Sequence, residues 1–360
     1  MRALTYVLFY FIFTYHSFSQ INAPKYSNEF LSIGIGARGL GLGGSQSALT
    51  SDVTSGYWNP AGLSRLSTKY EGALMHAEYF AGIAKYDYAG FATKLDSNSA
   101  LALSFIRFGV DDIPNTLDFY DTDGNGNKFF NYDKIKFFSI ADYAFLISYA
   151  RKSSKIKGLS LGTSFKVIHR TVDIFANSWG FGMDAGVQYE TSSGWMFGLM
   201  ARDVTTTFNA WSFKSSTFDT TFVATGNTVP VSTLEITLPK FIFGVAKCFR
   251  INEKFGITTT FDLDLSTDGK RNVLLKTGVI SGDPHAGIEL DFKRIIYLRA
   301  GGGNIQQIKN FEGGTYTSFQ PNFGIGVKVY KLTIDYALTN IGSVSESLYS
   351  NVFSIKASLK

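Results

Sequence analysis

From about residue 68 to its last residue, the sequence alternates between large apolar residues and small or polar ones. In the stretch 255–265, Gly, Thr and Asp occupy the even positions, and the odd positions hold Phe255, Ile257, Thr259, Phe261, Leu263 and Leu265. Successive side chains of a strand point to opposite faces, so each segment has one apolar and one polar face. The pattern predicts an all-β chain, which is either a soluble sandwich with the apolar face inside or a barrel in lipid with that face outside.

The connections between the alternating segments distinguish these two folds. We count about 14 segments, an even number within the range of bacterial outer-membrane barrels. Short connections, such as 96–98 and 191–193, largely alternate with long ones at 110–137, 204–239, 266–283, 303–317 and 339–349. Outer-membrane barrels have this pattern because their periplasmic turns stay short while their outer loops grow. The sequence therefore predicts a transmembrane antiparallel β-barrel of about 14 strands over residues 67–360.

The composition supports a barrel and gives no sign of catalysis. Aromatic residues make up 16% of the chain, with 33 Phe and 19 Tyr, which suits a lipid-facing wall with interfacial girdles. The formal net charge of +5 is too small to indicate nucleic-acid binding. Cys248 is the only cysteine, the four histidines lack ligand spacing, and no serine lies in a nucleophile elbow. We predict a protein that is not an enzyme.

The N-terminal residues are typical of an export signal. Arg2 precedes an apolar run at 3–15, and small residues at 17–19 flank a cleavage position before Gln20. These features predict a secretory signal peptide over residues 1–19, removed on the way to the outer membrane.

A glycine-rich stretch, 34–44, precedes the first predicted strand and contains the dinucleotide pattern GxGxxG twice. That motif requires a strand before it, a helix after it and a βαβ unit around it. Barrel strands follow here without a crossover helix. We therefore expect backbone packed too closely to admit Cβ atoms, as inside a barrel lumen, and we predict that residues 20–66 form a hatch or plug segment.

A longer motif extends from the glycine-rich stretch to the predicted first strand. Its residues are Gly36, Arg38, Gly39, Gly41, Gly43, Gly44, Asp52, Trp58, Asn59, Pro60, Ala61 and Gly62. This motif resembles the start of the PorV/PorQ family of Bacteroidetes outer-membrane proteins, a branch of the FadL-like barrels. The stretches 109–117 and 141–145 are also similar to members of this group. The resemblance implies a barrel of about 14 strands with an N-terminal hatch in its lumen.

The resemblance also implies a role in type IX protein secretion or surface attachment. In that role the long outer loops would bind secreted cargo or surface partners of the secretion system. Exposed aromatic residues often anchor such interfaces, although these could equally pack together as a loop cap. The candidates in the loop 204–239 are Trp211, Phe213, Phe218 and Phe222.

The alternative function is FadL-like transport of a hydrophobic small molecule across the outer membrane, with the glycine-rich segment as gate and an opening in the wall as exit. An apolar cavity inside the barrel would support this alternative. The strand faces instead predict a polar interior, which favours a protein partner. A purely structural barrel in outer-membrane lipid is a third possibility.

One loop stretch partly matches a calcium-binding loop. Asp121, Asp123 and Asn125 place oxygen ligands at alternate positions, and Gly126 follows where such a loop turns sharply. The twelfth position is Tyr132 rather than a bidentate Glu, and no helix pattern flanks the stretch. We predict an ordinary turn and no cofactor, with weak calcium binding as the alternative.

Overall fold

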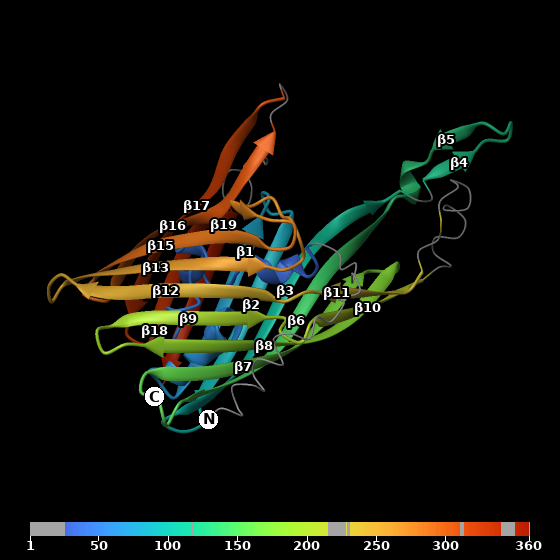
Figure 1. Cartoon of the computed structure of the whole chain (residues 1–360). Coiled ribbons are helices and arrows are strands. Elements are labelled where there is room, and N and C mark those ends of the chain that lie inside the picture. Colours follow the sequence, from blue (N-terminus) through green and yellow to red (C-terminus); the bar gives the residue numbers. More distant parts are fainter. Residues whose placement is uncertain are drawn as a thin grey trace, which may run out of the picture.

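The structure is a computed structural model that describes residues 26–116, 119–214, 228, 231–309, 313–339 and 350–359. Its main feature is a closed antiparallel β-barrel (Figure 1). The barrel closes because β1 (Tyr70–Tyr79) pairs with both β2 (Ala84–Lys94) and β19 (Ser350–Leu359). The predicted signal peptide lies outside the described residues.

The other wall strands follow in chain order, each paired with its neighbours in sequence. The first of them are β3 (Ser99–Asn115), β6 (Lys136–Lys152), β7 (Leu159–Val172) and β8 (Ala176–Glu190). Two wall strands are interrupted, so that β9 (Trp195–Arg202) continues as β10 (Thr207–Phe213), and β11 (Thr233–Thr237) continues as β12 (Lys240–Arg250). The last are β13 (Phe255–Ser266), β15 (Ser281–Phe292), β16 (Ile296–Lys309), β17 (Thr315–Val329) and β18 (Leu332–Thr339).

The predicted barrel of about 14 strands is confirmed. The sheet contains 17 strands, and they form fourteen wall strands because two wall strands are each divided and β14 (Leu275–Lys276) lies within a connection. The apolar face points outward, as predicted. On β13, Phe255 and Phe261 are exposed, whereas Thr258, Thr260 and Asp262 are buried on the inner side.

The two ends of the barrel differ in their connections. Short turns such as 191–194, 251–254 and 330–331 lie at the end where β1 starts and β19 finishes. We call this the periplasmic end, and the opposite one the extracellular end. Two extracellular connections, 80–83 and 173–175, are also short.

The long connections are more structured than predicted. β3 continues to Asn115 and β6 begins at Lys136, so β3 takes up the first part of the predicted connection 110–137. Between them β4 (Tyr120–Thr122) and β5 (Lys128–Phe130) form a hairpin, with η3 (Tyr132–Lys134) after it. This extracellular arm, residues 119–135, projects away from the barrel (Figure 1). Similarly, β10 and β11 occupy part of the predicted loop 204–239. The strands are longer than predicted because backbone pairing with neighbouring strands continues beyond the last strongly apolar residues of the outer face.

An N-terminal segment, residues 26–66, lies inside the barrel (Figure 1). We call it the lumen segment. Its short helices are η1 (Glu29–Ser32), α2 (Ala37–Gly41), α3 (Ser55–Trp58) and η2 (Pro60–Arg65). Their apolar residues form a core with inward side chains of the wall, including Tyr86, Ile106 and Ile168. Within the described residues, no helix is long and apolar enough to cross a membrane.

Candidate functional site

Inward-facing glycines of the wall allow the lumen segment to fit. At each of these positions, an added Cβ would lie closer to lumen-segment atoms than real side chains allow. Gly301, for example, faces the backbone of Leu42 and Gly43. The wall glycines of this kind, on β7, β8, β9, β12, β15 and β16, are Gly162, Gly186, Gly198, Gly244, Gly287 and Gly301.

The glycines of the lumen segment itself serve turns and close contacts. Gly36, Gly43 and Gly44 have positive φ, which glycine adopts without strain. Gly39 packs under the Trp58 ring, and Gly41 packs against Gly324 of the wall. The stretch forms only the five-residue helix α2, with no preceding strand, so it lacks the βαβ unit of a dinucleotide site.

The Asn-Pro-Ala-Gly turn is fixed to the barrel by the Asn59 side chain. Asn59 Nδ2 donates to the carbonyls of Ser47 (2.8 Å) and Val187 (3.1 Å), and Asn59 Oδ1 caps η2 by accepting from Ala61 N (3.2 Å). Pro60 and Ala61 press against Gly162 of β7. Gly62 leaves room for the carbonyl of residue 50. The turn therefore positions the lumen segment relative to β7 and β8.

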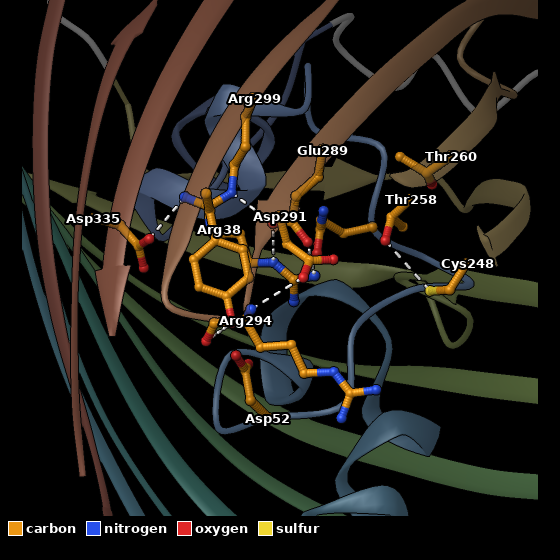
Figure 2. A network of polar contacts seen from close by, with 12 residues as sticks. Arg38, Asp52, Cys248, Thr258, Thr260, Glu289, Asp291, Arg294, Arg299 and Asp335 are labelled. Carbon is orange, nitrogen blue, oxygen red and sulfur yellow. Dashed lines mark hydrogen bonds and ion pairs between the residues drawn. The ribbon is translucent and has the colours of Figure 1, made fainter. Parts of the chain in front are cut away.

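A buried ion network fixes the other side of the segment (Figure 2). Arg38 forms a bidentate pair with Glu289 on β15, with both N–O distances 2.9 Å. Arg299 on β16 also binds Glu289 (2.6 Å) and reaches Asp335 on β18 (2.7 Å). Asp52 pairs with Lys356 on β19. The motif residues Arg38 and Asp52 thus join the segment to β15 and β19.

Most acidic residues of the polar strand faces have basic partners on nearby strands or on the lumen segment. The exception is Asp262, which instead accepts the backbone N–H groups of Gln46 (2.9 Å) and Ser47 (2.8 Å). The pairs are Asp184–Lys166, Glu190–Arg65, Asp264–Lys240, Glu289–Arg38 and Asp291–Arg250.

A buried cluster closes the interruption between β9 and β10. Asp203 and Thr206 have positive φ, and β8 residues 182–184 lie opposite this break, between its pairings with β9 and β10. Lys166 on β7, only 2% exposed, pairs with Asp184 (2.7 Å) and Asp203 (2.6 Å). The two-residue alternation of the sequence did not identify Lys166 as a site residue. Its position on the polar, inward face of a predicted strand, among small residues, could have indicated a buried cation.

A cavity of about 400 Å³ lies between the lumen segment and the extracellular end. Ile33, Leu40 and Trp58 of the lumen segment line it, together with residues at the extracellular ends of β12, β13 and β15 to β17. Its lining combines apolar side chains with Asp262, Asn322 and other polar groups. The interior is therefore partly apolar, and not only polar as predicted.

The lipid-facing wall has an apolar groove of about 700 Å³ that extends from β18 and β19 across β1, β2 and β3 to β6. Gly72 and Ala89 present small groups on the outer face, and large residues such as Phe91 and Phe105 line the rest. On the inner face, Ala73 pairs with Gly90, and the Tyr88 side chain lies over Gly90.

The prediction that Trp211 and Phe213 lie in a long loop is wrong. Trp211 and Phe213 belong to β10 and continue the barrel wall. The indole Nε1 of Trp211 donates to Glu235 (2.6 Å), and the Arg170 guanidinium lies 5.1 Å from its ring centroid. They are half-buried, not a free docking surface. Phe218 and Phe222 lie outside the described residues.

The candidate calcium residues lie in the arm, in and beside the β4–β5 turn. Asp123 Oδ1 accepts the backbone N–H groups of Asn125 (2.9 Å) and Asn127 (2.8 Å), and Asp121 pairs with Lys134 (3.0 Å). The bonds from Asn127 lower the pKa of Asp123 below its usual value. In the described residues no group of three His, Cys, Asp or Glu side chains is placed to hold a metal ion.

Solved structures with a similar fold are outer-membrane barrels. The toluene transporter TbuX of Ralstonia pickettii matches 91% of this chain and 99% of its own, at 12% identity and a TM-score of 0.54. The monoaromatic hydrocarbon channel CymD matches 91% and 98%, at 12% identity and a TM-score of 0.55. A FadL homologue of Pseudomonas aeruginosa matches 89% and 97%, at 10% identity and a TM-score of 0.51.

These matches, with the fourteen-strand wall, show the fold of the protein: a closed antiparallel β-barrel of the FadL-like type. No family model matches the sequence, and no curated protein matches it. The predicted FadL-like barrel is thus confirmed as a fold, while the closer PorV/PorQ resemblance stays a prediction.

Proposed function

We propose that this barrel admits a small hydrophobic molecule from outside the cell and releases it sideways into the outer membrane. The first support is the fold, because TbuX and CymD, described as a toluene transporter and a hydrocarbon channel, share it over nearly their whole length. The second support is the filled lumen. The lumen segment contacts β3, β6 to β8 and β16 to β19, so a straight aqueous path is blocked there.

The observation that carries the proposal is a row of three spaces. The extracellular cavity reaches Leu40 and Trp58. Directly behind Trp58, Gly39 borders a small pocket that also touches Ala73 of β1. Ala73 in turn borders the apolar groove on the lipid side. Two barriers separate these spaces: the Trp58 ring, and the Ala73–Gly90 pair with the Tyr88 side chain over Gly90.

Filling the groove tests this route. Gly72 faces the lipid, and a Cβ there would touch only the Gly90 carbonyl, at 3.8 Å, so Gly72→Phe fits the folded barrel. We expect this variant to reduce uptake of labelled toluene by cells several-fold, because the phenyl ring occupies the exit. Thr259→Phe, on the lipid face of β13, is the matched control. Equal uptake by both variants and by cells lacking the protein would contradict the proposal.

A second candidate function, docking of a secreted or surface protein as in type IX secretion, is supported by the extracellular arm. Tyr120, Phe129, Phe130 and Tyr132 are exposed there, and Phe119 stacks on Phe130 with ring centroids 5.0 Å apart. Exposed aromatic clusters often anchor protein interfaces.

Deleting residues 120–130 tests the docking candidate without touching the wall. We expect the barrel to assemble normally and to recover fewer surface proteins when purified from native membranes. The deletion is better placed than one at Trp211, which would remove part of a wall strand. Identical sets of recovered proteins would count against this candidate.

A further inference from the structure

The outward face of the wall changes from apolar to polar just beyond the apolar groove. Toward the extracellular end, the groove stops at Leu74 on β1, Ala89 on β2, Phe105 on β3 and Phe145 on β6. The next outward residue of each strand, two positions further along, is polar. These four residues, which we call the polar row, are His76, Asp87, Arg107 and Tyr143.

Strand pairing places the members of the polar row side by side. His76 is opposite Asp87, Asp87 is opposite Arg107, and Arg107 is opposite Tyr143. His76 Nδ1 lies 2.7 Å from Asp87 Oδ1, and Arg107 Nη1 donates to Asp87 Oδ2 at 3.4 Å. Two positions along a strand span roughly 7 Å, so the row forms the upper edge of the groove over four adjacent strands.

Further charged side chains lie beyond the polar row, and they form ion pairs with it and with each other. Asp111 pairs with Lys85 (3.3 Å) and with Arg107 (3.7 Å). Glu78 lies 3.8 Å from His76. Because Lys85 and Arg107 both have carboxylate partners, a phosphate would find no unpaired cation among these groups.

The polar row lies close to the extracellular surface of the membrane. β1 has ten residues, so with the tilt usual in outer-membrane barrels it rises about 25 Å, the height of their apolar band. The connection 80–83 above it is a tight turn. Beside the row, His169 and Trp179 on β7 and β8 stack with ring centroids 4.2 Å apart, and such rings favour the membrane interface. The row therefore faces lipid headgroups, and the groove below it faces acyl chains.

We propose that this face of the barrel binds a glycolipid, with an acyl chain in the apolar groove and an uncharged sugar headgroup on the polar row. Hydroxyl groups both donate and accept, so a sugar can bridge side chains that are already paired without adding charge. The side chains of His76, Asp87 and Arg107 are 50%, 35% and 26% exposed, which leaves them open to such contacts. The inference goes beyond the proposed function and does not depend on it.

Lipid retention by the purified full-length barrel tests the inference. The protein is reconstituted in nanodiscs that contain equal amounts of monoglucosyl diacylglycerol, phosphatidylethanolamine and phosphatidylglycerol, all with the same acyl chains. After transfer into a polyether detergent, native mass spectrometry identifies the lipids that stay bound. We expect one monoglucosyl diacylglycerol per barrel, retained at least ten-fold more often than either phospholipid.

Two variants test the headgroup contact and the chain contact separately. Arg107→Ala removes the central donor of the polar row, and Gly72→Phe fills the groove. Each should reduce retention of the glycolipid at least five-fold, and both residues face outward, so the lumen is untouched. The matched controls are Thr259→Phe on β13 and Lys247→Ala on β12, where Lys247 lies 4.5 Å from the Trp195 ring centroid near the periplasmic end. Both controls should retain the glycolipid like the unaltered protein.

Three outcomes would overturn the inference. If the phospholipids are retained as well as the glycolipid, or if no lipid is retained, the polar row does not bind a sugar headgroup. If Arg107→Ala and Gly72→Phe retain the glycolipid unchanged, it binds elsewhere on the barrel. If the spectrum shows two chains without lipid, this face joins two copies of the protein.

The proposed function fails separately from this inference. A Gly72→Phe variant that loses the glycolipid but takes up toluene normally would remove the transport route and leave the lipid site intact. A variant that loses toluene uptake but retains the glycolipid would have the opposite meaning.

Discussion

At the scale of single residues, Glu289 joins the lumen segment to two wall strands. It is 4% exposed and binds both Arg38 and Arg299. We expect Glu289→Gln to destabilise the protein by about 3 kcal/mol, because Arg38 loses its carboxylate and the buried Arg299 keeps only Asp335. The measurement is the urea midpoint of unfolding in detergent.

The control for this prediction is Asp291→Asn. Asp291 pairs with the more exposed Arg250 (2.8 Å), so its loss should cost at most about 1 kcal/mol. Equal midpoints for Glu289→Gln, Asp291→Asn and the unchanged protein would mean that the Arg38 contact contributes little.

Gly301 tests the close packing of the lumen segment. An added methyl group there would collide with the backbone of Leu42 and Gly43, so Gly301→Ala should displace the segment and cost about 1–3 kcal/mol. We predict faster trypsin cleavage after Arg38 or Arg65 in the folded barrel. Gly278→Ala, which meets nothing within 4 Å, should be cleaved like the original. Unchanged cleavage in Gly301→Ala would show that the wall strand moves to accommodate the methyl group while the lumen segment stays in place.

At the scale of elements, the wall strands were predictable. One face of each strand is apolar and the other faces the polar interior, so the sequence alternates with a period of two residues. The ends of strands were less predictable. In β10, the outward residues after Phe208 are Ala210 and Ser212, so the apolar face is lost although pairing with β8 continues. The arm strands β4 and β5 are too short for any alternation to show.

The candidate site was only half visible in the sequence. The glycine-rich run and Asn59 indicated close packing in a lumen, because such residue types have few other uses. Their partners were not predictable: Arg38 and Glu289 are 251 residues apart, and they meet only because the barrel closes. The lining of the extracellular cavity likewise depends on which strands become neighbours.

The interruption between β9 and β10 offers a prediction at this scale. Lys166→Met should destabilise the barrel by about 3–5 kcal/mol, because Asp184 and Asp203 lose their shared buried cation. Adding Asp184→Asn and Asp203→Asn should restore part of the lost stability, since the unpaired charges are then gone. Thermal unfolding followed by circular dichroism compares the variants. If the variant with all three substitutions is no more stable than Lys166→Met, the unpaired carboxylates do not cause the loss of stability.

At the scale of the whole molecule, the filled lumen predicts a barrel that does not conduct ions as an open pore. In planar bilayers we expect a closed protein, and we expect openings in a double variant with Glu289→Gln and Gly301→Ala, which loosens the lumen segment. The matched double variant with Asp291→Asn and Gly278→Ala should stay closed. Large steady conductance of the unaltered protein would show that the segment does not block the lumen.

The central claim is that the apolar strand faces contact lipid while the opposite faces surround the lumen segment. The most direct measurement is a spin-label scan of positions 255–262 on β13, one cysteine at a time, in a Cys248→Ser background reconstituted in lipid. The account predicts that oxygen accessibility peaks at 255, 257, 259 and 261 and is low at the positions between them. The opposite phase, or no two-residue period at all, would contradict it.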